Sequence, residues 1–205
     1  MQNPIPDRKI DLSAYGTAIA MSDAPDRLIA FLMAYEAARG NKTVPRRSDL
    51  NLRQMASLLP DLTIMERIAP GNVVYRLMGT SVAHRLGTDL TGHNFIEYLD
   101  ATERLRIDEC IALVADRPCG TFSVYENTYA SGAHVRAETI TLPLDSGSGC
   151  APYLVLGLHS AQAIMSYDVA QQGSVIGTCW RDGVVLDLGF GVPEQSVLDR
   201  LKTTP

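Results

Sequence analysis

The sequence predicts an α+β domain, because five strand-like segments are divided by a run of short helices. Two of these segments come first, at residues 62–68 and 73–78. The helical region follows at residues 80–116, where apolar residues recur at helical spacing between glycines. The other three strand-like segments come last, at residues 120–129, 134–144 and 153–158. A strand that leads directly into several short helices is the most distinctive feature of the chain.

The N-terminal part contains one amphipathic helix. Residues 1–22 follow no regular hydrophobic period. Asp23 is a suitable N-cap for a helix that has Pro25 in its first turn and continues to Arg39, with Gly40 just beyond its end. The apolar stripe of this helix comprises Leu28, Phe31, Leu32 and Tyr35. Such a stripe ordinarily packs on the helix's own domain.

A second, shorter helix is expected before the first strand. Pro45 keeps the residue before it extended, and Asp49 or Asn51 is a suitable N-cap for a helix that continues to Leu59. Arg47 and Asp49 are spaced for a local ion pair or cap. At a protein surface such a pair contributes about 0–1 kcal/mol, so its role would be to place the helix.

Glycines separate the elements of the helical region. Gly79 ends the second strand, and Gly87 ends the first helical turn. We expect both glycines to adopt backbone conformations that residues with a Cβ avoid. Asp100 and Glu103 have the spacing of a capping box for a long helix over residues 101–116.

The strand-like segments carry their own signals. Residues 69–72 place Pro and Gly at the two central positions of a type II turn. In the segment 134–144 the apolar phase shifts between Ala137 and Ile140, which indicates either a bulge or burial on both faces. The unbroken apolar run at 153–158 is typical of a central strand covered on both faces.

The second strand and the helices after it, YRLMGTSVAHRLGTDLTG, resemble the PAS domain, and in particular a bacterial subfamily of short stand-alone PAS proteins. The stretch before the first strand resembles it too, with a proline, Arg47 and Asp49 as Arg-x-Asp, and a short helix ending in Leu-Pro. The resemblance implies a five-stranded antiparallel sheet with helices inserted after the second strand and a small-molecule pocket between them. It also implies an alternative role for the N-terminal helix, as the seam of a homodimer.

The sequence therefore predicts three parts: an N-terminal arm and helix at 1–42, a PAS-like domain at 43–160 and a C-terminal extension at 161–205. In the extension, residues 175–180 and 184–188 are expected to form a hairpin around an Asp-Gly turn. Residues 193–201 are expected to form a last short helix.

Composition argues against several classes of function. A net charge of −5 disfavours direct binding to nucleic acid, which usually requires a basic surface. No apolar run approaches the roughly 20 residues that span a bilayer, and the N-terminus lacks the features of a signal peptide. The expected location is the cytoplasm. The P-loop and the common hydrolase motifs do not occur in the sequence.

No metal or cofactor is expected. The cysteines are widely spaced without a C-x-x-C pair, which is typical of buried or idle thiols: Cys110, Cys119, Cys150 and Cys179. Haem would need an axial histidine, usually on the long helix of a PAS domain, and residues 101–116 contain none. Flavin photochemistry would need a cysteine in an N-C-R-F-L-type segment, which is missing. These observations disfavour haem and flavin and leave an unknown organic ligand, or none.

The candidate ligand-binding residues surround the expected cleft: Tyr75, Arg76, Met78, His93, Phe95, Tyr98, Phe122 and Tyr125. The aromatic ones either line a mostly apolar cavity or fill it themselves. Arg76 either holds an anionic group in the cleft or pairs with Asp61, Glu66 or Asp89 at the sheet margin. His93 and Tyr98 could orient a ligand through hydrogen bonds.

These observations favour a non-catalytic sensory or signalling protein that binds a small organic ligand or an unknown protein partner and acts as a homodimer. One alternative is a purely structural interaction module with a filled core. The other is a small enzyme with Arg76, Asp89 and His93 as its site. These three residues lack the spacing of a nucleophile and its base, so no catalytic residue is expected.

Overall fold

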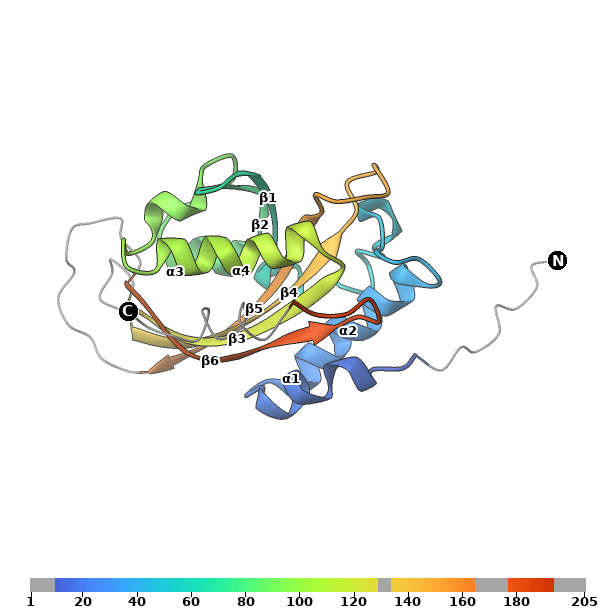
Figure 1. Ribbon diagram of the computed structural model, residues 1–205. Coiled ribbons are helices and arrows are strands. Elements are labelled where there is room, and N and C mark those ends of the chain that lie inside the picture. The colour runs from blue at the N-terminus through green and yellow to red at the C-terminus, as the bar shows by residue number, and fades with distance from the viewer. Residues whose placement is uncertain (1–9, 129–133, 165–176, 194–205) are drawn as a thin grey trace.

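The computed structural model describes residues 10–128, 134–164 and 177–193. Its centre is a six-stranded sheet in the order β2-β1-β5-β4-β3-β6, and all neighbouring strands are antiparallel (Figure 1). The strands are β1 (Leu62–Ala69), β2 (Asn72–Met78), β3 (Cys119–Thr128), β4 (His134–Leu144), β5 (Leu154–Ile164) and β6 (Gly177–Asp187).

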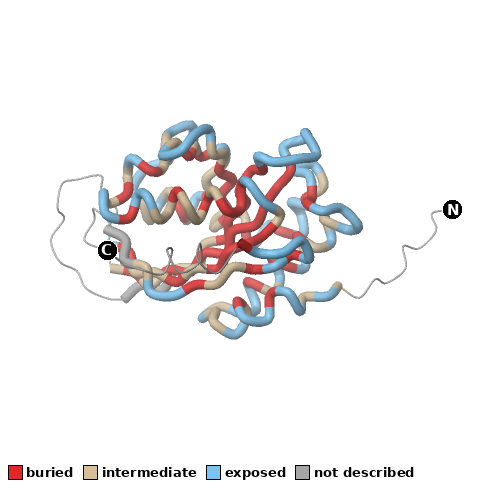
Figure 2. The backbone as a smooth tube through the Cα atoms, in the orientation of Figure 1, coloured by how far each residue is buried: buried red, intermediate tan, exposed pale blue. Residues whose placement is uncertain are grey.

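Helices cover both faces of this sheet (Figure 1). One face, here called the α2 face, packs on α1 (Gly16–Met21) and α2 (Pro25–Arg39). The other, the α4 face, packs on α3 (Thr80–Leu86), the 3₁₀ helix η4 (Phe95–Tyr98) and α4 (Arg104–Asp116). Figure 2 shows the buried backbone gathered in the sheet between these layers. The predicted α+β class, with helices inserted after the second strand, is confirmed, although the sheet has a sixth strand.

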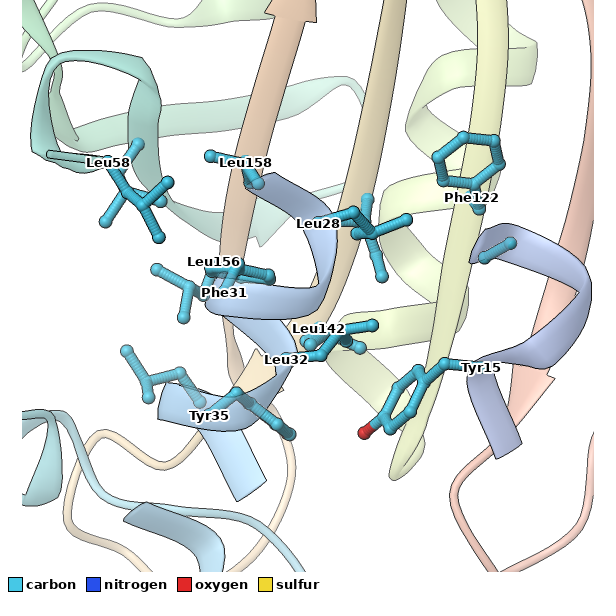
Figure 3. Close-up of a cluster of buried hydrophobic side chains, with 14 of the residues drawn as sticks. Tyr15, Leu28, Phe31, Leu32, Tyr35, Leu58, Phe122, Leu142, Leu156 and Leu158 are labelled. Carbon is cyan, nitrogen blue, oxygen red and sulfur yellow. The ribbon is translucent and has the colours of Figure 1, made fainter. Parts of the chain in front are cut away.

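The apolar stripe of α2 packs inside its own chain. Its four members, Leu28, Phe31, Leu32 and Tyr35, are each at most 3% exposed. Figure 3 shows them facing sheet residues that include Leu142 and Leu156. The Tyr35 hydroxyl also donates a hydrogen bond to the Pro143 carbonyl at 2.8 Å. Packing on its own domain is therefore the correct interpretation of this stripe, and the dimer-seam alternative for these side chains is wrong.

The stretch before β1 is less regular than expected. In place of a helix over 51–59, it forms turns that end in the 3₁₀ helix η3 (Leu59–Asp61). The Asp49 carboxylate accepts a hydrogen bond from the Arg46 backbone N–H at 2.8 Å and pairs with Lys42 at 2.6 Å. The Asp49 carboxylate thus closes the 3₁₀ helix η2 (Arg47–Asp49) instead of capping a helix to Leu59, and its ion pair is made with Lys42 instead of Arg47.

The two glycines around α3 differ from each other. Gly87 has φ +75°, the left-handed conformation expected at the end of a helix. Gly79 has φ −69°, which any residue adopts, so the expectation of an unusual backbone there is wrong. Gly79 is required for a different reason, because a Cβ would lie 2.3 Å from the Pro60 carbonyl oxygen.

The long helix also starts later than its capping box predicts. α4 begins at Arg104, and Asp100 instead accepts a hydrogen bond from the Thr102 backbone N–H at 3.0 Å. β4 has the predicted bounds, and its register with β3 and β5 is uninterrupted. The phase shift in β4 therefore reflects burial on both faces, and the bulge alternative is wrong.

The predicted C-terminal hairpin is wrong, because residues 177–187 of the extension form one continuous strand, β6. β6 pairs with β3 from Cys119↔Asp187 to Thr128↔Gly177, with a register shift at Arg181. An Asp-Gly pair favours a turn locally, but here β6 covers the edge that β3 would otherwise expose. The helix expected at 193–201 lies outside the described residues from 194 onward.

Candidate functional site

A cavity of about 130 Å³ lies between the α4 face of the sheet and the helices over it. Helical residues such as Leu86, Phe95 and Ile107 form its apolar wall. The sheet forms a polar floor from residues at alternate positions of three strands, since alternate side chains share a face. On β3 these are Thr121, Ser123, Tyr125 and Asn127, on β4 Thr139 and Thr141, and on β5 His159.

Two aromatic rings contribute to the apolar lining of the cavity. The rings of Tyr75 and Phe95 are tilted by 60° with their centroids 5.2 Å apart, a favourable arrangement. Asn94 positions Phe95, because its side-chain oxygen caps η4 at the Ile96 N–H (3.2 Å) and also accepts from the Val73 N–H (3.0 Å). The side chain of Asn94 thus attaches this helical segment to β2.

A chain of hydrogen bonds crosses the polar floor. The Tyr125 hydroxyl bonds to the Thr139 hydroxyl, which lies 2.9 Å from His159 Nδ1. The other ring nitrogen, Nε2, lies 2.8 Å from the Thr63 hydroxyl. Gly157 makes room for this contact, since a Cβ there would lie 2.7 Å from Thr63 Oγ1. The neighbouring hydroxyls of Thr121 and Thr141 are 2.5 Å apart.

The imidazole of His159 is neutral at physiological pH. Although it lines the cavity, protein atoms surround it, and this desolvation lowers its pKa to about 3. A neutral imidazole has one N–H donor and one acceptor nitrogen, so one of its threonine partners accepts while the other donates. The floor is therefore polar but uncharged.

This neutrality makes stability depend on pH. In the unfolded chain His159 takes up a proton below about pH 6.5, whereas in the folded chain its pKa is about 3 and it stays neutral. The free energy of unfolding therefore decreases as the pH is lowered below 6.5. We expect wild type to lose about 2 kcal/mol more than His159→Gln between pH 7.5 and pH 5. Urea denaturation at both pH values measures this difference. Equal losses in the two proteins would contradict a neutral His159.

The charged groups beside the cavity are paired. Glu103 and Arg106 form an ion pair with side chains only 9% and 11% exposed, and the Arg106 guanidinium lies 5.4 Å from the Trp180 ring centroid. Arg85 pairs with Asp61 at 3.0 Å, and Asp61 also accepts from Arg27 of α2 at 2.5 Å. Asp61 thus connects the cavity wall to the helix layer on the opposite face.

Three of the candidate residues line the cavity: Tyr75, Phe95 and Tyr125. Met78 and Tyr98 pack in the same apolar cluster, beside the cavity and not among its lining residues. The aromatic residues therefore leave space between them and do not fill the cleft completely.

The other three candidates lie elsewhere. Phe122 is on the α2 face, because it alternates with the cavity-lining Thr121 and Ser123. Arg76 is exposed at the register shift between β1 and β2 and pairs with Glu66 at 2.5 Å, so the sheet-margin alternative is confirmed. His93 is also exposed, with Nδ1 3.2 Å from the Thr91 carbonyl oxygen. These placements correct the expectation that Phe122, Arg76 and His93 face the cleft.

Sequence reasoning missed most of the polar floor. Thr139, His159 and Trp180 all line the cavity. A usable signal was present, because the polar residues of β3 alternate with Phe122 and Val124 along the strand. His159 carried no such signal, since its partners Thr63 and Thr139 are distant in sequence.

The cysteine side chains that the structure describes are free thiols. Burial raises the pKa of Cys110, which lines the cavity, to about 12, and that of Cys119 to about 11. Both are therefore protonated at neutral pH. Within residues 10–128, 134–164 and 177–193, no group of three or more His, Cys, Asp or Glu side chains is arranged to hold a metal ion.

Comparison with known proteins identifies the family. A family model described as PAS domain matches residues 24–160, more than half of the chain. The match begins at the start of the α2 region, and the predicted division into parts at 42/43 and 160/161 stays a prediction. None of the curated proteins compared matches the chain. In the part of the chain that the structure describes, no helix is long and apolar enough to cross a membrane. By its sequence match and its sheet-and-helix architecture, the chain belongs to the PAS domain family.

Proposed function

We propose that this protein is a non-catalytic sensory module that binds a small organic molecule in the cavity on the α4 face. The observation that carries the proposal is the combination of an apolar wall with a polar floor, because small-molecule sites are mostly apolar with a few placed polar groups. The floor groups hold one another through hydrogen bonds, so they are already oriented before a ligand arrives.

The chemistry of the cavity supports binding without turnover. A general base works best with a pKa near the operating pH, whereas the pKa of His159 is about 3. A nucleophilic cysteine needs a lowered pKa, whereas that of Cys110 is about 12. Arg76, Asp89 and His93, the site of the enzyme alternative, are exposed residues outside the cavity lining.

An ion-pair bridge supports a sensory role. Arg85 lines the cavity and shares Asp61 with Arg27 of α2, so a ligand that moved Arg85 would alter a contact on the other face. Such a shared carboxylate is a physical route by which ligand binding changes the contacts of α2 on the α2 face. Homodimerisation, an unidentified signalling partner, the cytoplasmic location and bacterial origin stay predictions, as does the alternative of an interaction module without a ligand.

Native mass spectrometry and thermal-shift screening test the proposal together. We expect either a retained small molecule that denaturation releases, or a metabolite that raises the melting temperature. A ligand at one hundred times its dissociation constant stabilises the folded state by about 2.7 kcal/mol. The same native spectra report whether the protein is a dimer.

A cavity-filling variant makes the test specific. Ala137 is buried and lines the cavity, so Ala137→Leu should abolish the ligand-induced shift. Ala56→Leu adds the same atoms at an exposed position and should leave the shift intact. If no retained mass and no stabilising metabolite is found for wild type, the interaction module becomes the better description.

A further inference from the structure

We infer that the ligand is an uncharged molecule of about one ring that carries a hydroxyl, amide or carbonyl group, and that Ser123 anchors this group. The inference rests on the proposed function and specifies its ligand. The volume of the cavity indicates the size of the ligand. The cavity volume is about 130 Å³, and an apolar cavity of roughly 150 Å³ accepts benzene. The cavity volume therefore matches a ligand of about one ring.

The charged groups around the cavity favour an uncharged ligand. The guanidinium groups that line the cavity, those of Arg85 and Arg106, are already paired with Asp61 and Glu103. His159 is neutral, and each of these two guanidinium groups already has a carboxylate partner, which for Arg85 is shared with Arg27. An anionic or cationic ligand would bring an unmatched charge into a largely desolvated site, or would have to break one of these pairs. A neutral ligand avoids both costs.

The cavity also offers a hydroxyl group that is available to a ligand. Ser123 lines the cavity, and its side chain has no hydrogen-bond partner among the residues that the structure describes. It lies directly opposite Thr139 across the β3–β4 pair, which places it beside the hydroxyl–imidazole chain. A serine hydroxyl both donates and accepts, so it would satisfy a ligand hydroxyl, amide or carbonyl group.

A flat aromatic surface lies beside that hydroxyl. Gly183 is the β6 partner of Ser123, and a Cβ there would lie 3.3 Å from two atoms of the Trp180 indole. The glycine thus allows the indole to lie close against the strand. Trp180, Tyr75 and Phe95 all line the cavity, and aromatic side chains offer the flat contact area that suits a ring.

Two pairs of similarly shaped probes test the inference by titration calorimetry on the full chain. Phenol and toluene have nearly the same shape and differ in one hydroxyl. Benzamide and benzoate have nearly the same shape and differ in charge. We expect phenol to bind at least tenfold more tightly than toluene, and benzamide at least tenfold more tightly than benzoate. The two-ring probe 1-naphthol should bind more weakly than phenol.

Two serine variants locate the anchor. Ser123→Ala should weaken phenol binding about tenfold and leave toluene binding unchanged, since only phenol loses a hydrogen bond. Ser57→Ala, at an exposed position outside the cavity, should change neither. A phenol affinity that is unchanged in Ser123→Ala overturns the anchor, and tighter binding of benzoate than of benzamide overturns the neutral class. Either result leaves ligand binding itself in place. If none of the five probes binds, the proposed ligand class is wrong. The proposed function itself is wrong only if native mass spectrometry finds no retained molecule and the thermal-shift screen finds no stabilising metabolite.

Discussion

Replacing Phe31 by alanine should lower the free energy of unfolding by about 3–5 kcal/mol. Phe31 is fully buried in the middle of α2 and packs between the helix and the sheet (Figure 3). Truncation removes the apolar contact area and leaves a cavity that close-packed neighbours fill only partly. Chemical denaturation of purified variants measures the loss. If the alanine variant does not fold, Phe31→Leu should fold with a smaller loss of stability.

A control on the same helix separates packing from assembly. Met33 is 41% exposed, so Met33→Ala should change the free energy of unfolding by less than about 1 kcal/mol. A Phe31→Ala protein that unfolds like wild type but changes from dimer to monomer would contradict the packing described for α2. It would restore the dimer seam that the burial of the stripe argues against.

Much of the fold was predictable because its signals are local. α2 ends at Arg39 as its C-terminal glycine indicates, and β4 covers residues 134–144 as its composition indicates. Gly71 has φ +74°, in agreement with a type II turn. A cap, a turn residue or a hydrophobic period acts within a few residues, so a single sequence carries it.

The wrong predictions share a different cause: contacts with distant parts of the chain override the local sequence preference. The Asp182-Gly183 pair has turn character, yet pairing with β3 makes it part of a strand. Phe122 looks like a pocket residue by type, yet its face is decided by the strand phase and by the helices on each side. The polar floor depends on three strands brought side by side, so His159 could not be connected with Thr63 before the topology was known.

The close packing around Gly79 predicts the second large loss of folding stability. A Cβ at this position would lie 2.3 Å from the Pro60 carbonyl oxygen and 2.5 Å from that of Leu59. Both atoms belong to the backbone at the entry to β1, and the Gly79 N–H donates to the Leu62 carbonyl at 2.8 Å. A shift of either side would disturb the junction of β1, β2 and α3. We therefore expect Gly79→Ala to cost about 3 kcal/mol, at the upper end for overpacked sites.

Two other glycines serve as matched controls for this substitution. Gly87 has open space around it but φ +75°, so Gly87→Ala should cost about 1 kcal/mol through backbone conformation alone. Gly16 has neither constraint and starts α1, so Gly16→Ala should be neutral or slightly stabilising. Urea denaturation of the three variants should rank them Gly79, Gly87, Gly16 by loss of stability. A Gly79→Ala loss no larger than that of Gly87→Ala would show that the chain relieves the close approach to Pro60 by shifting the strand junction.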